Sequence, residues 1–369
     1  MTESILLTDS RLVGPVRVVG SGLLGTSIGL GLRAKGIDVI LDDASPANLS
    51  LAVDYGAGRP AEPGDSPQLI VVCVPPDVTG RVVAAELAAF PDAIVTDVAS
   101  VKVQPLEELR AAGADLSRYI GSHPLAGRER GGAVAGRADL FLGRPWVVTG
   151  HDGISYREGS SNDDLILDLG AVPVELSPEE HDRAVALVSH VPQLIATLLA
   201  KRLLGAAHSS VGLAGQGLRD TTRIAASEPE LWVQILGANA PAITPILRAY
   251  RDDLDAVLAA LEHPTAPRAR RTLAEAIAAG NAGVAAIPGK HGQDRRYSQI
   301  VVMVDDRPGE LARLLTEIGA SGVNMEDLRL EHSPGAQIGL AEISVLPEVE
   351  QQLTDELESR GWRIAGASL

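Results

Sequence analysis

The sequence predicts an α/β chain in three parts: a doubly wound domain of the Rossmann type, an all-helical domain and a small ferredoxin-like βαββαβ domain. Short apolar runs alternate with helical patterns over residues 1–176, which is typical of a mostly parallel sheet. Residues 177–287 carry helical patterns only, and residues 288–296 have the glycine and proline signals of a linker. Residues 297–369 then show the order strand, helix, strand, strand, helix, strand.

The first part is expected to begin with the strand Val16–Val19, a glycine turn and a helix that Gly36 ends. A second helix is expected over residues 78–89, after Pro75 and Pro76 have stopped the preceding strand. The remaining strands of this part are expected at residues 38–43, 69–74, 93–97, 145–149 and 171–176.

The helical part is expected to begin at Ser177, which opens the Ser-Pro-Glu-Glu pattern of a capping box. Apolar residues recur every three to four positions over 184–198 and nearly surround the helix, so we expect it to be buried. A second long helix is expected over 231–261, bent at Pro241 and Pro245. A long helical segment beside a nucleotide-binding domain often supplies a dimer interface, and we expect a homodimer.

The last part is expected to hold strands at residues 300–304, 328–331, 338–345 and 362–364. Its two helices are expected after the turn at residues 306–309, ended by Gly322, and over residues 349–359.

Composition limits the classes of partner. The formal net charge is −16 and long runs of Lys or Arg are missing, so we expect no nucleic acid and no membrane as a partner. The single cysteine, Cys73, lies in an apolar run and is expected to be a buried structural thiol. The N-terminus lacks a basic start, and no apolar stretch reads as long and charge-free enough to span a bilayer, so we expect a cytoplasmic protein.

A glycine motif follows the first strand and opens the first helix. It reads Gly20-Ser21-Gly22-Leu23-Leu24-Gly25. The first glycine permits a tight turn, the second lets the backbone approach a pyrophosphate, and the third lets helix and strand pack closely. The helix N-terminus adds free N–H groups. The alternative is a glycine turn that serves packing only.

Asp43 ends the second strand about twenty residues on, where a carboxylate bonds the adenosine ribose. Asp42 is the weaker candidate. A carboxylate at this point repels a 2′-phosphate, so we expect NAD rather than NADP. The strand ends at Val74, Pro75 and Pro76 and at Asp97 are assigned to the same cofactor site, because ligands of such sheets bind at the carboxyl ends of the strands.

Three further segments contain residue types that carry chemistry. They are residues 96–102, 121–131 and 215–225. Each has a plain structural interpretation: His123 as a hydrogen-bonded loop histidine, Arg223 as a surface ion-pair partner and Ser100 as a helix cap. Composition does not choose between the two interpretations.

With these segments the chain resembles the prephenate and arogenate dehydrogenase family of tyrosine biosynthesis over nearly its whole length. The resemblance rests on the glycine turn, Ser-Val-Lys at Ser100, His-Pro-Leu-Ala-Gly at His123, Ser-His-Val-Pro at Ser189, Asp-Thr-Thr-Arg-Ile-Ala at Asp220, and Glu-Pro-Glu-Leu-Trp ending at Trp232. It implies an oxidative decarboxylation of prephenate, in which hydride leaves C4 for the nicotinamide and carbon dioxide leaves C1. No metal is implied.

The resemblance also implies roles for individual residues. His123 would accept the proton of the ring hydroxyl, which suits an imidazole at neutral pH. Ser100 would orient that hydroxyl, His123 and the nicotinamide, and Arg223 would pair with a substrate carboxylate.

Other residues would complete the substrate site. Glu129, Arg219 and Asp220 would form an ionic network at the entrance, beside Gly217. Ser189 and Gln193 would face the substrate from the long helix. The family suggests that Trp232 reaches the site from a partner subunit; ordinary helix packing is the alternative.

The chain departs from the family at Gln193, where relatives often have histidine after Ser-His-Leu-Pro. An acidic residue there would better suit the ammonium group of arogenate, so Gln193 favours prephenate. An arogenate dehydrogenase is the alternative, and a non-catalytic amino-acid sensor is the alternative of another class.

The tail, with Arg-Pro-Gly ending at Gly309 and Gly-Val-Asn at Gly322, resembles an ACT domain. Such domains commonly bind amino acids as regulators. Gly309, Val323 and Asn324 would hold the effector, and tyrosine is the expected feedback inhibitor. The alternative is a tail that only aids dimerisation.

Overall fold

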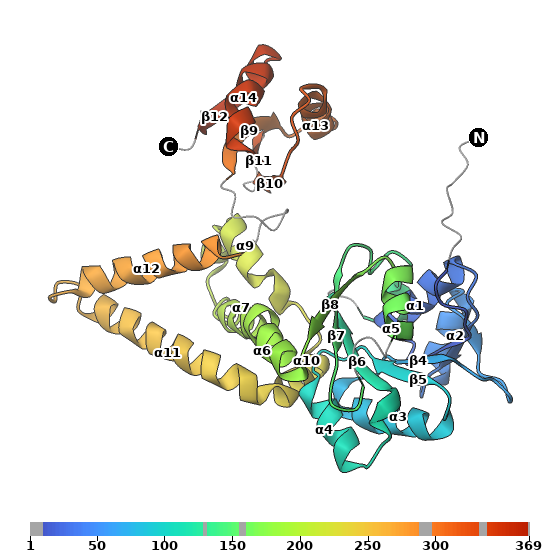
Figure 1. Ribbon diagram of the computed structural model, residues 1–369. Helices are drawn as coiled ribbons and strands as arrows, with labels where there is room; N and C mark the ends of the chain where they lie inside the picture. The colour runs from blue at the N-terminus through green and yellow to red at the C-terminus, as the bar shows by residue number, and fades with distance from the viewer. Residues whose placement is uncertain (1–9, 128–130, 155–159, 288–296, 332–337, 368–369) are drawn as a thin grey trace. The chain divides into compact units, whose positions relative to one another are not determined.

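The computed structural model describes residues 10–127, 131–154, 160–287, 297–331 and 338–367. It forms two compact units, which are described separately (Figure 1). The first unit holds the chain up to residue 204 together with residues 222–249, and the second holds residues 205–221 and the chain from residue 250 onward.

The first unit is built on an eight-stranded sheet with the order β3-β2-β1-β4-β5-β6-β7-β8. All neighbouring strands are parallel except β6 and β7, which confirms the mostly parallel, doubly wound sheet. The strands are β1 (Val16–Val19), β2 (Val39–Asp42), β3 (Arg59–Pro60), β4 (Leu69–Val72), β5 (Ile94–Asp97), β6 (Tyr119–Pro124), β7 (Pro145–Thr149) and β8 (Val172–Leu176).

Two of these strands, β3 and β6, are missing from the sequence prediction. The strand β6 has the sequence Tyr-Ile-Gly-Ser-His-Pro, and glycine and proline are depleted in strands. Its ladder with β5 places it in the sheet all the same, with Asp97 opposite Gly121. The consequence matters for the site, because His123 becomes the fifth residue of a strand rather than a loop residue.

Helices cover both faces of this sheet (Figure 1). Alternate residues of β1 feed two separate cores: Val16 and Val18 pack in one, and Val19 packs in the other. The helices are α1 (Leu23–Ala34), α2 (Pro46–Asp54), α3 (Pro76–Ala89), α4 (Val103–Ala111) and α5 (Ser160–Asp168), with short 3-10 turns η1 (Leu116–Arg118) and η2 (Ala133–Ala135).

The first unit continues into helices. They are α6 (Pro178–Val185), the π-helical turn η3 (Ala186–His190), α7 (Val191–Lys201), η4 (Arg223–Ala225), α10 (Pro229–Ala238) and the first half of α11 (Ala240–Glu262). The capping box at Ser177 is present, with the side chains and backbone of Ser177 and Glu180 bonded reciprocally. The helix is interrupted at Asn239, two residues before Pro241, so that Pro241 lies in the first turn of α11, whereas Pro245 lies inside α11.

The expectation of a buried helix over residues 184–198 is wrong for the single chain. Leu187 is 60% exposed, Val188 67% and Leu198 55%. By length and composition, Pro178–Lys201 could even cross a membrane, which contradicts the estimate that no stretch is apolar enough. One side of this helical segment is nevertheless packed inside the unit. His181 and His190 are both buried, and they form hydrogen bonds with Asp182 and Asn239, respectively.

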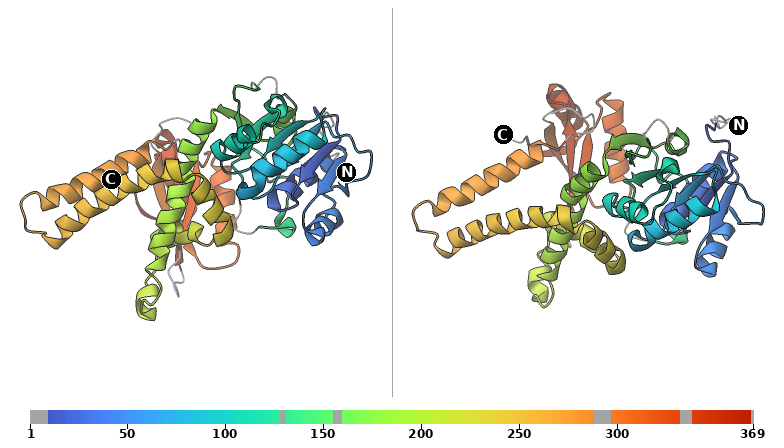
Figure 2. Two further views of the ribbon diagram at one scale, coloured as in Figure 1. Left: turned by 90° about the horizontal axis from the view of Figure 1, so that it is seen from below. Right: turned by 60° about the horizontal axis from the view of Figure 1, so that its bottom comes forward.

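The second unit contains α8 (His208–Val211), α9 (Gln216–Thr222), the second half of α11 and α12 (Ala269–Ala285). From the turn that joins them, α12 and the second half of α11 run in opposite directions and diverge (Figure 2). The unit ends with a four-stranded antiparallel sheet of order β10-β11-β9-β12. Its elements are β9 (Ser298–Asp305), α13 (Glu310–Ala320), β10 (Asp327–Glu331), β11 (Ile338–Val345), η5 (Pro347–Val349), α14 (Glu350–Ser359) and β12 (Arg363–Ala367).

This order of elements and strands is the ferredoxin-like βαββαβ arrangement that the sequence predicts. Its core lies between the sheet and the two helices α13 and α14, and it is formed around Val302, Leu314, Ile343 and Leu353. The assignment of this fold to the ACT family stays a prediction at this stage.

Candidate active site

The glycine turn has the geometry of a phosphate-binding loop. Gly20 has a φ of +99°, and a Cβ there would lie 2.4 Å from the Cys73 carbonyl oxygen. A Cβ on Gly25 would lie 1.9 Å from the Gly20 carbonyl oxygen, so this glycine lets helix α1 approach the strand. A Cβ on Gly22 would meet nothing within 4 Å. The middle glycine therefore borders open space beside the first turn of α1, where helix N–H groups are unpaired and a pyrophosphate fits.

Asp43 lies directly after β2 and reaches back to this turn. Its carboxylate accepts hydrogen bonds from the Ser21 N–H at 2.6 Å, the Ser21 hydroxyl at 2.7 Å and the Ser45 N–H at 2.8 Å. Asp42 instead pairs with Arg17 at 2.5 Å. Since a carboxylate offers about four lone-pair sites, Asp43 can still accept from a ribose hydroxyl.

Asp97, which the sequence assigns to the cofactor, is occupied inside the protein. It is fully buried, pairs with Lys102 Nζ, and accepts from the Tyr119 hydroxyl at 2.7 Å and the Ala99 N–H at 2.8 Å. Burial, opposed by the Asp97 charge, lowers the pKa of Lys102, whereas burial and Asp97 together raise the pKa of Tyr119 well above its usual value. Asp97 thus organises the end of β5.

Lys102 links this cluster to the neighbouring strand. Its Nζ donates to the Ser122 carbonyl at 2.7 Å, and the Ser122 hydroxyl donates to the Asp97 carbonyl at 2.8 Å. Trp146 Nε1 donates to the same hydroxyl at 2.9 Å. These bonds hold the backbone on the N-terminal side of His123 in place.

His123 lies near the carboxyl end of β6 and contacts a second histidine. Its Nδ1 is 2.8 Å from Nε2 of His181, and His181 Nδ1 is 2.7 Å from Oδ1 of Asp182. Burial lowers the pKa of His123 well below 6.5, and the nearby groups His181, Lys102 and His190 lower it further, each to the extent that it is protonated. At neutral pH the His123 imidazole is therefore uncharged and has a lone pair to accept a proton.

Ser100 lies in the loop after β5, on the same edge of the sheet as His123. In the part of the chain that the structure describes, the side chains of Ser100 and His123 form no hydrogen bond with each other. Its orienting role stays a prediction for the complex with substrate, because hydrogen bonds of a catalytic site often tighten only when substrate is bound.

The helical segments place several predicted substrate residues in the first unit. Gln193 is buried and donates to the Ser227 hydroxyl at 2.7 Å, whereas Ser189 is exposed on η3. Trp232 meets the buried His190 edge to face, with ring centroids 6.1 Å apart. Arg223 is exposed in η4.

Four of the predicted residues lie in the second unit or outside the described residues. Gly217, Arg219 and Asp220 lie on α9 in the second unit, where Gln216 Nε2 donates to Asp220 at 2.8 Å. Glu129 lies outside the described residues. The ionic network at the entrance stays a prediction.

His181 and Asp182 are the site residues that the sequence reasoning missed. A signal for them exists, because they share a helix face with the buried Val185 and Ala186, and a polar pair on such a face needs partners. Among the described residues no group of three or more His, Cys, Asp or Glu side chains is arranged to hold a metal ion.

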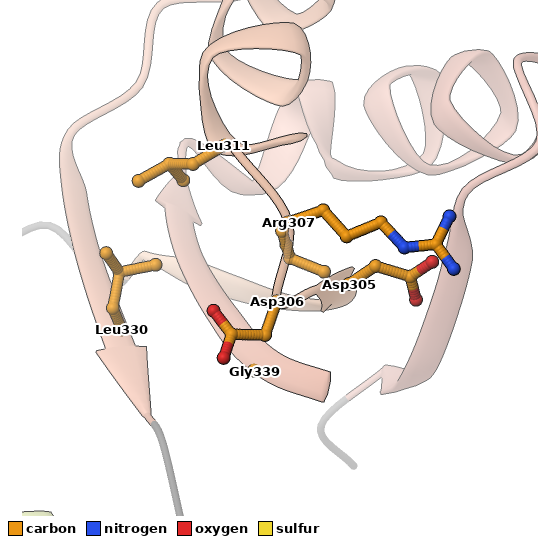
Figure 3. Close-up of a pocket in the computed structure, with 7 residues that line it drawn as sticks. Asp305, Asp306, Arg307, Leu311, Leu330 and Gly339 are labelled. Atoms are coloured by element: carbon orange, nitrogen blue, oxygen red, sulfur yellow. The ribbon is translucent and has the colours of Figure 1, made fainter. Parts of the chain in front are cut away.

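A pocket of about 200 Å³ lies in the ferredoxin-like domain (Figure 3). It is lined by Val304, Asp305, Asp306, Arg307, Leu311, Leu330 and Gly339. None of the three predicted effector residues is among the residues that line this pocket. Gly309 is the N-cap of α13 with a φ of +93°, and Val323 is buried in the core. Asn324 Nδ2 donates to Glu326.

Known proteins match the chain in both sequence and fold. Residues 28–156 match the family "Prephenate dehydrogenase, nucleotide-binding domain", and residues 177–275 match "Prephenate dehydrogenase, dimerization domain". The relative "Probable prephenate dehydrogenase NovF" of Streptomyces niveus is 36% identical over 355 residues, which cover 94% of this chain and 98% of the relative.

Solved structures share the fold of about three quarters of the chain. Prephenate dehydrogenase from A. aeolicus has a TM-score of 0.64 at 24% identity, covering 75% of this chain and 100% of that one. Arogenate dehydrogenase from Synechocystis has a TM-score of 0.57 at 26% identity, covering 73% of this chain and 99% of that one. The chain belongs to the prephenate dehydrogenase family.

Proposed function

We propose that the protein catalyses the NAD-dependent oxidative decarboxylation of prephenate to 4-hydroxyphenylpyruvate in the cytoplasm. The observation that carries the proposal is His123: an uncharged imidazole at the carboxyl end of β6, on the sheet edge where the glycine turn also lies. The name of the 36% identical relative from Streptomyces niveus supports the same reaction.

The nucleotide site fits NAD. The open space at Gly22 suits the pyrophosphate, and the Asp43 carboxylate suits the ribose hydroxyls while repelling a 2′-phosphate. The backbone at Val74, Pro75 and Pro76 lies at the end of β4, next to the turn, and would border the cofactor. When bound, NAD supplies the acceptor for the hydride from C4.

His123 Nε2 accepts a hydrogen bond from the ring hydroxyl and takes its proton as C4 is oxidised. This proton transfer develops a carbonyl at C4, which withdraws electrons as the carboxylate at C1 leaves as carbon dioxide. The protonated His123 then returns the proton to the phenolate oxygen of the product. Ser100 orients the hydroxyl, and the guanidinium of Arg223 pairs with a substrate carboxylate.

Gln193 is the residue proposed to favour prephenate over arogenate. Its amide is held by Ser227 and has no charge, so it offers no ion pair to the ammonium group of arogenate. Prephenate carries a keto group at that position, to which an amide N–H can donate. Arogenate dehydrogenase is the second candidate function, supported by the likeness to the Synechocystis enzyme.

We also propose a homodimer in which helical segments pair. The matched dimerization family covers residues 177–275, and Leu187, Val188 and Leu198 are exposed in the single chain. Pairing would bury these side chains and would explain an apolar helix that is covered on one side only. Trp232 is proposed to face the substrate near this interface.

The ferredoxin-like domain is proposed to be an ACT domain that binds tyrosine as feedback inhibitor. The relative from Streptomyces niveus covers 94% of the chain and so includes this domain. Leu311, Leu330 and Asp306 lie on one side of the pocket, whereas the Arg307 side chain extends away from the two leucines (Figure 3). The two leucines suit the apolar part of an amino-acid side chain. The sequence places the contacts at Gly309, Val323 and Asn324.

Four assays test the function. Purified protein is mixed with prephenate or arogenate, each with NAD or NADP, and NADH formation and the aromatic product are followed. Turnover of prephenate with NAD, giving 4-hydroxyphenylpyruvate, is expected. Turnover of arogenate alone would move the assignment to the second candidate, and no turnover of either with NAD or NADP bound would favour a non-catalytic sensor.

A further inference from the structure

We propose that His181 and Asp182 are positioning residues that hold His123 in the one tautomer able to act as a base. The three side chains form a continuous hydrogen-bonded series from Asp182 through His181 to His123. This inference rests on the proposed role of His123, but the tautomer it predicts can be measured without turnover.

The series is anchored at Asp182. Its Oδ1 accepts from the Lys102 N–H at 2.8 Å and its Oδ2 accepts from the Val103 N–H at 3.0 Å. Asn239 Nδ2 donates to the Asp182 carbonyl at 2.8 Å. The carboxylate is therefore fixed to the segment after β5, and Asp182 as a residue is only 4% exposed.

The direction of each hydrogen bond follows from Asp182. An ionised carboxylate only accepts, so His181 Nδ1 must carry the proton that it shares with Asp182. The pKa of His181 is lowered, mainly by burial, so the ring is neutral and its Nε2 has a lone pair. His123 Nδ1 lies 2.8 Å from that lone pair and must donate to it. His123 is thus held as the Nδ1–H tautomer, and its Nε2 is free to accept the substrate proton.

The series also stabilises the product of proton transfer. When His123 Nε2 takes a proton, the ring becomes an imidazolium whose Nδ1–H still donates to His181. The Asp182 charge lies one ring away and favours this cation, in the manner of a serine protease triad. Burial, together with the nearby Lys102, opposes the cation and keeps the resting base neutral.

The helix that carries the pair is built to hold it. The capping box of Ser177 and Glu180 sets the first turn of α6, and His181 is the next residue. The exposed fraction of His181 is 0%, and its ring meets that of His123 edge to face at 5.1 Å. A residue with a packing role only would not need both ring nitrogens engaged.

Two near-isosteric variants separate positioning from packing. His181→Gln places an amide at the ε position, where its oxygen can accept from His123, but loses the bond to Asp182. His181→Asn places an amide at the δ position, which keeps the bond to Asp182 but leaves His123 Nδ1 without a partner. We expect kcat to fall by about 10²-fold or more in His181→Asn and clearly less in His181→Gln, with KM for NAD little changed in both.

The opposite order of kcat, or equal losses, would overturn the proposal. His151→Asn is the control, because His151 is a partly buried histidine with Nε2 3.0 Å from the Tyr119 carbonyl, and it takes no part in the site. This control is expected to keep the kcat of the unaltered protein. Binding of NAD, followed by fluorescence, shows in each variant that the nucleotide domain is folded.

A second measurement decides the inference even if the His181 variants do not fold. Ring-nitrogen NMR of the ¹⁵N-histidine-labelled protein, with signals assigned through His123→Asn, reports the tautomer directly. The Nδ1–H form of His123 at neutral pH is expected, and the Nε2–H form or an imidazolium would overturn the proposal. If the protein turns over neither prephenate nor arogenate, the proposed function fails while this NMR result still stands or falls by itself.

Discussion

His123 combines two properties that a base needs, a lone pair at neutral pH and a fixed direction. The lone pair follows from burial, which lowers its pKa, and the direction follows from the contact with His181. The same environment makes the base active below the pH at which a free histidine becomes protonated. We expect kcat to stay constant from pH 8 to about pH 6 and to decline only at lower pH, as a pH–rate profile with prephenate would show. An acid limb centred near 6.5 would contradict the depressed pKa.

The preference for NAD is assigned to Asp43 alone. Asp43→Asn removes the charge that repels a 2′-phosphate but keeps an oxygen for the Ser21 N–H. We expect the ratio of kcat/KM for NADP to that for NAD to rise by roughly tenfold, as expected for about 1.4 kcal/mol. Asp42→Asn is the matched control, because Asp42 pairs with Arg17, and its ratio should not change. A larger change of the ratio in Asp42→Asn than in Asp43→Asn would show that Asp42, and not Asp43, sets the cofactor selectivity.

His190 ties stability to pH. Burial lowers its pKa from 6.5 to about 4, so as the pH falls the unfolded chain binds this proton before the folded chain does. The contribution is fully present above pH 6.5 and is lost between pH 6.5 and about 4, at up to about 1.4 kcal/mol per pH unit. Urea unfolding at several pH values should show this slope, and His190→Gln should flatten it. An unchanged slope in the variant would exclude His190 as the source.

At the scale of the elements, the glycine turn combines two separable functions. Gly22→Ala adds a Cβ to open space and should leave the thermal midpoint unchanged while weakening NAD binding by tenfold or more, because the methyl group occupies the pyrophosphate position. Gly25→Ala adds a Cβ 1.9 Å from the Gly20 carbonyl and should destabilise the fold itself. Gly283→Ala, in α12 with nothing near its Cβ, is the control for both measurements. Equal effects of the first two variants on stability would contradict this division.

The elements also show where sequence reasoning succeeds and where it stops. The strand β1, the glycine turn and helix α1 are predicted within one or two residues, because each has a local signal. The strand β6 is missed, since its glycine and proline hide a strand that only its ladder with β5 creates. The helix break is predicted at the prolines and occurs two residues before Pro241, at Asn239. The bonds from the Asn239 side chain to Asp182 and His190 have no local signal in the sequence.

The site shows the same limit more sharply. The family motifs identify His123, Ser100 and Arg223 as candidates, because those motifs are contiguous in the sequence. The contact between His123 and His181 joins residues that are 58 positions apart, and no local sequence pattern predicts it. The contact depends on where α6 packs relative to the end of β6, and hydrophobic periodicity alone does not predict that position.

At the scale of the whole molecule, exposed apolar side chains on the helical segments predict an interface. Val188→Glu puts a charge on η3 where the side chain is 67% exposed, and we expect the dimer to dissociate at least tenfold more readily. Val134→Glu is the matched control, because Val134 is also 67% exposed but lies on η2 in the nucleotide domain. Size-exclusion chromatography with light scattering at several concentrations measures both. A dimer that resists Val188→Glu, or that Val134→Glu disrupts equally, would place the interface elsewhere.

The net charge of −16 also bears on the substrate, because prephenate is a dianion that the whole molecule repels. Local cations must therefore recover the affinity, and Arg223 is the residue proposed to do so.

The most direct test of the account is hydride transfer in a single turnover. Excess protein preloaded with NAD is mixed with prephenate, and NADH absorbance is followed by stopped flow for the unaltered protein and for His123→Asn. We predict a single exponential rise of NADH in the unaltered protein and a rate constant lower by about 10²–10⁴-fold in the variant, with NAD affinity preserved. Full activity of His123→Asn would contradict the account, because the proton would then have to leave through another group.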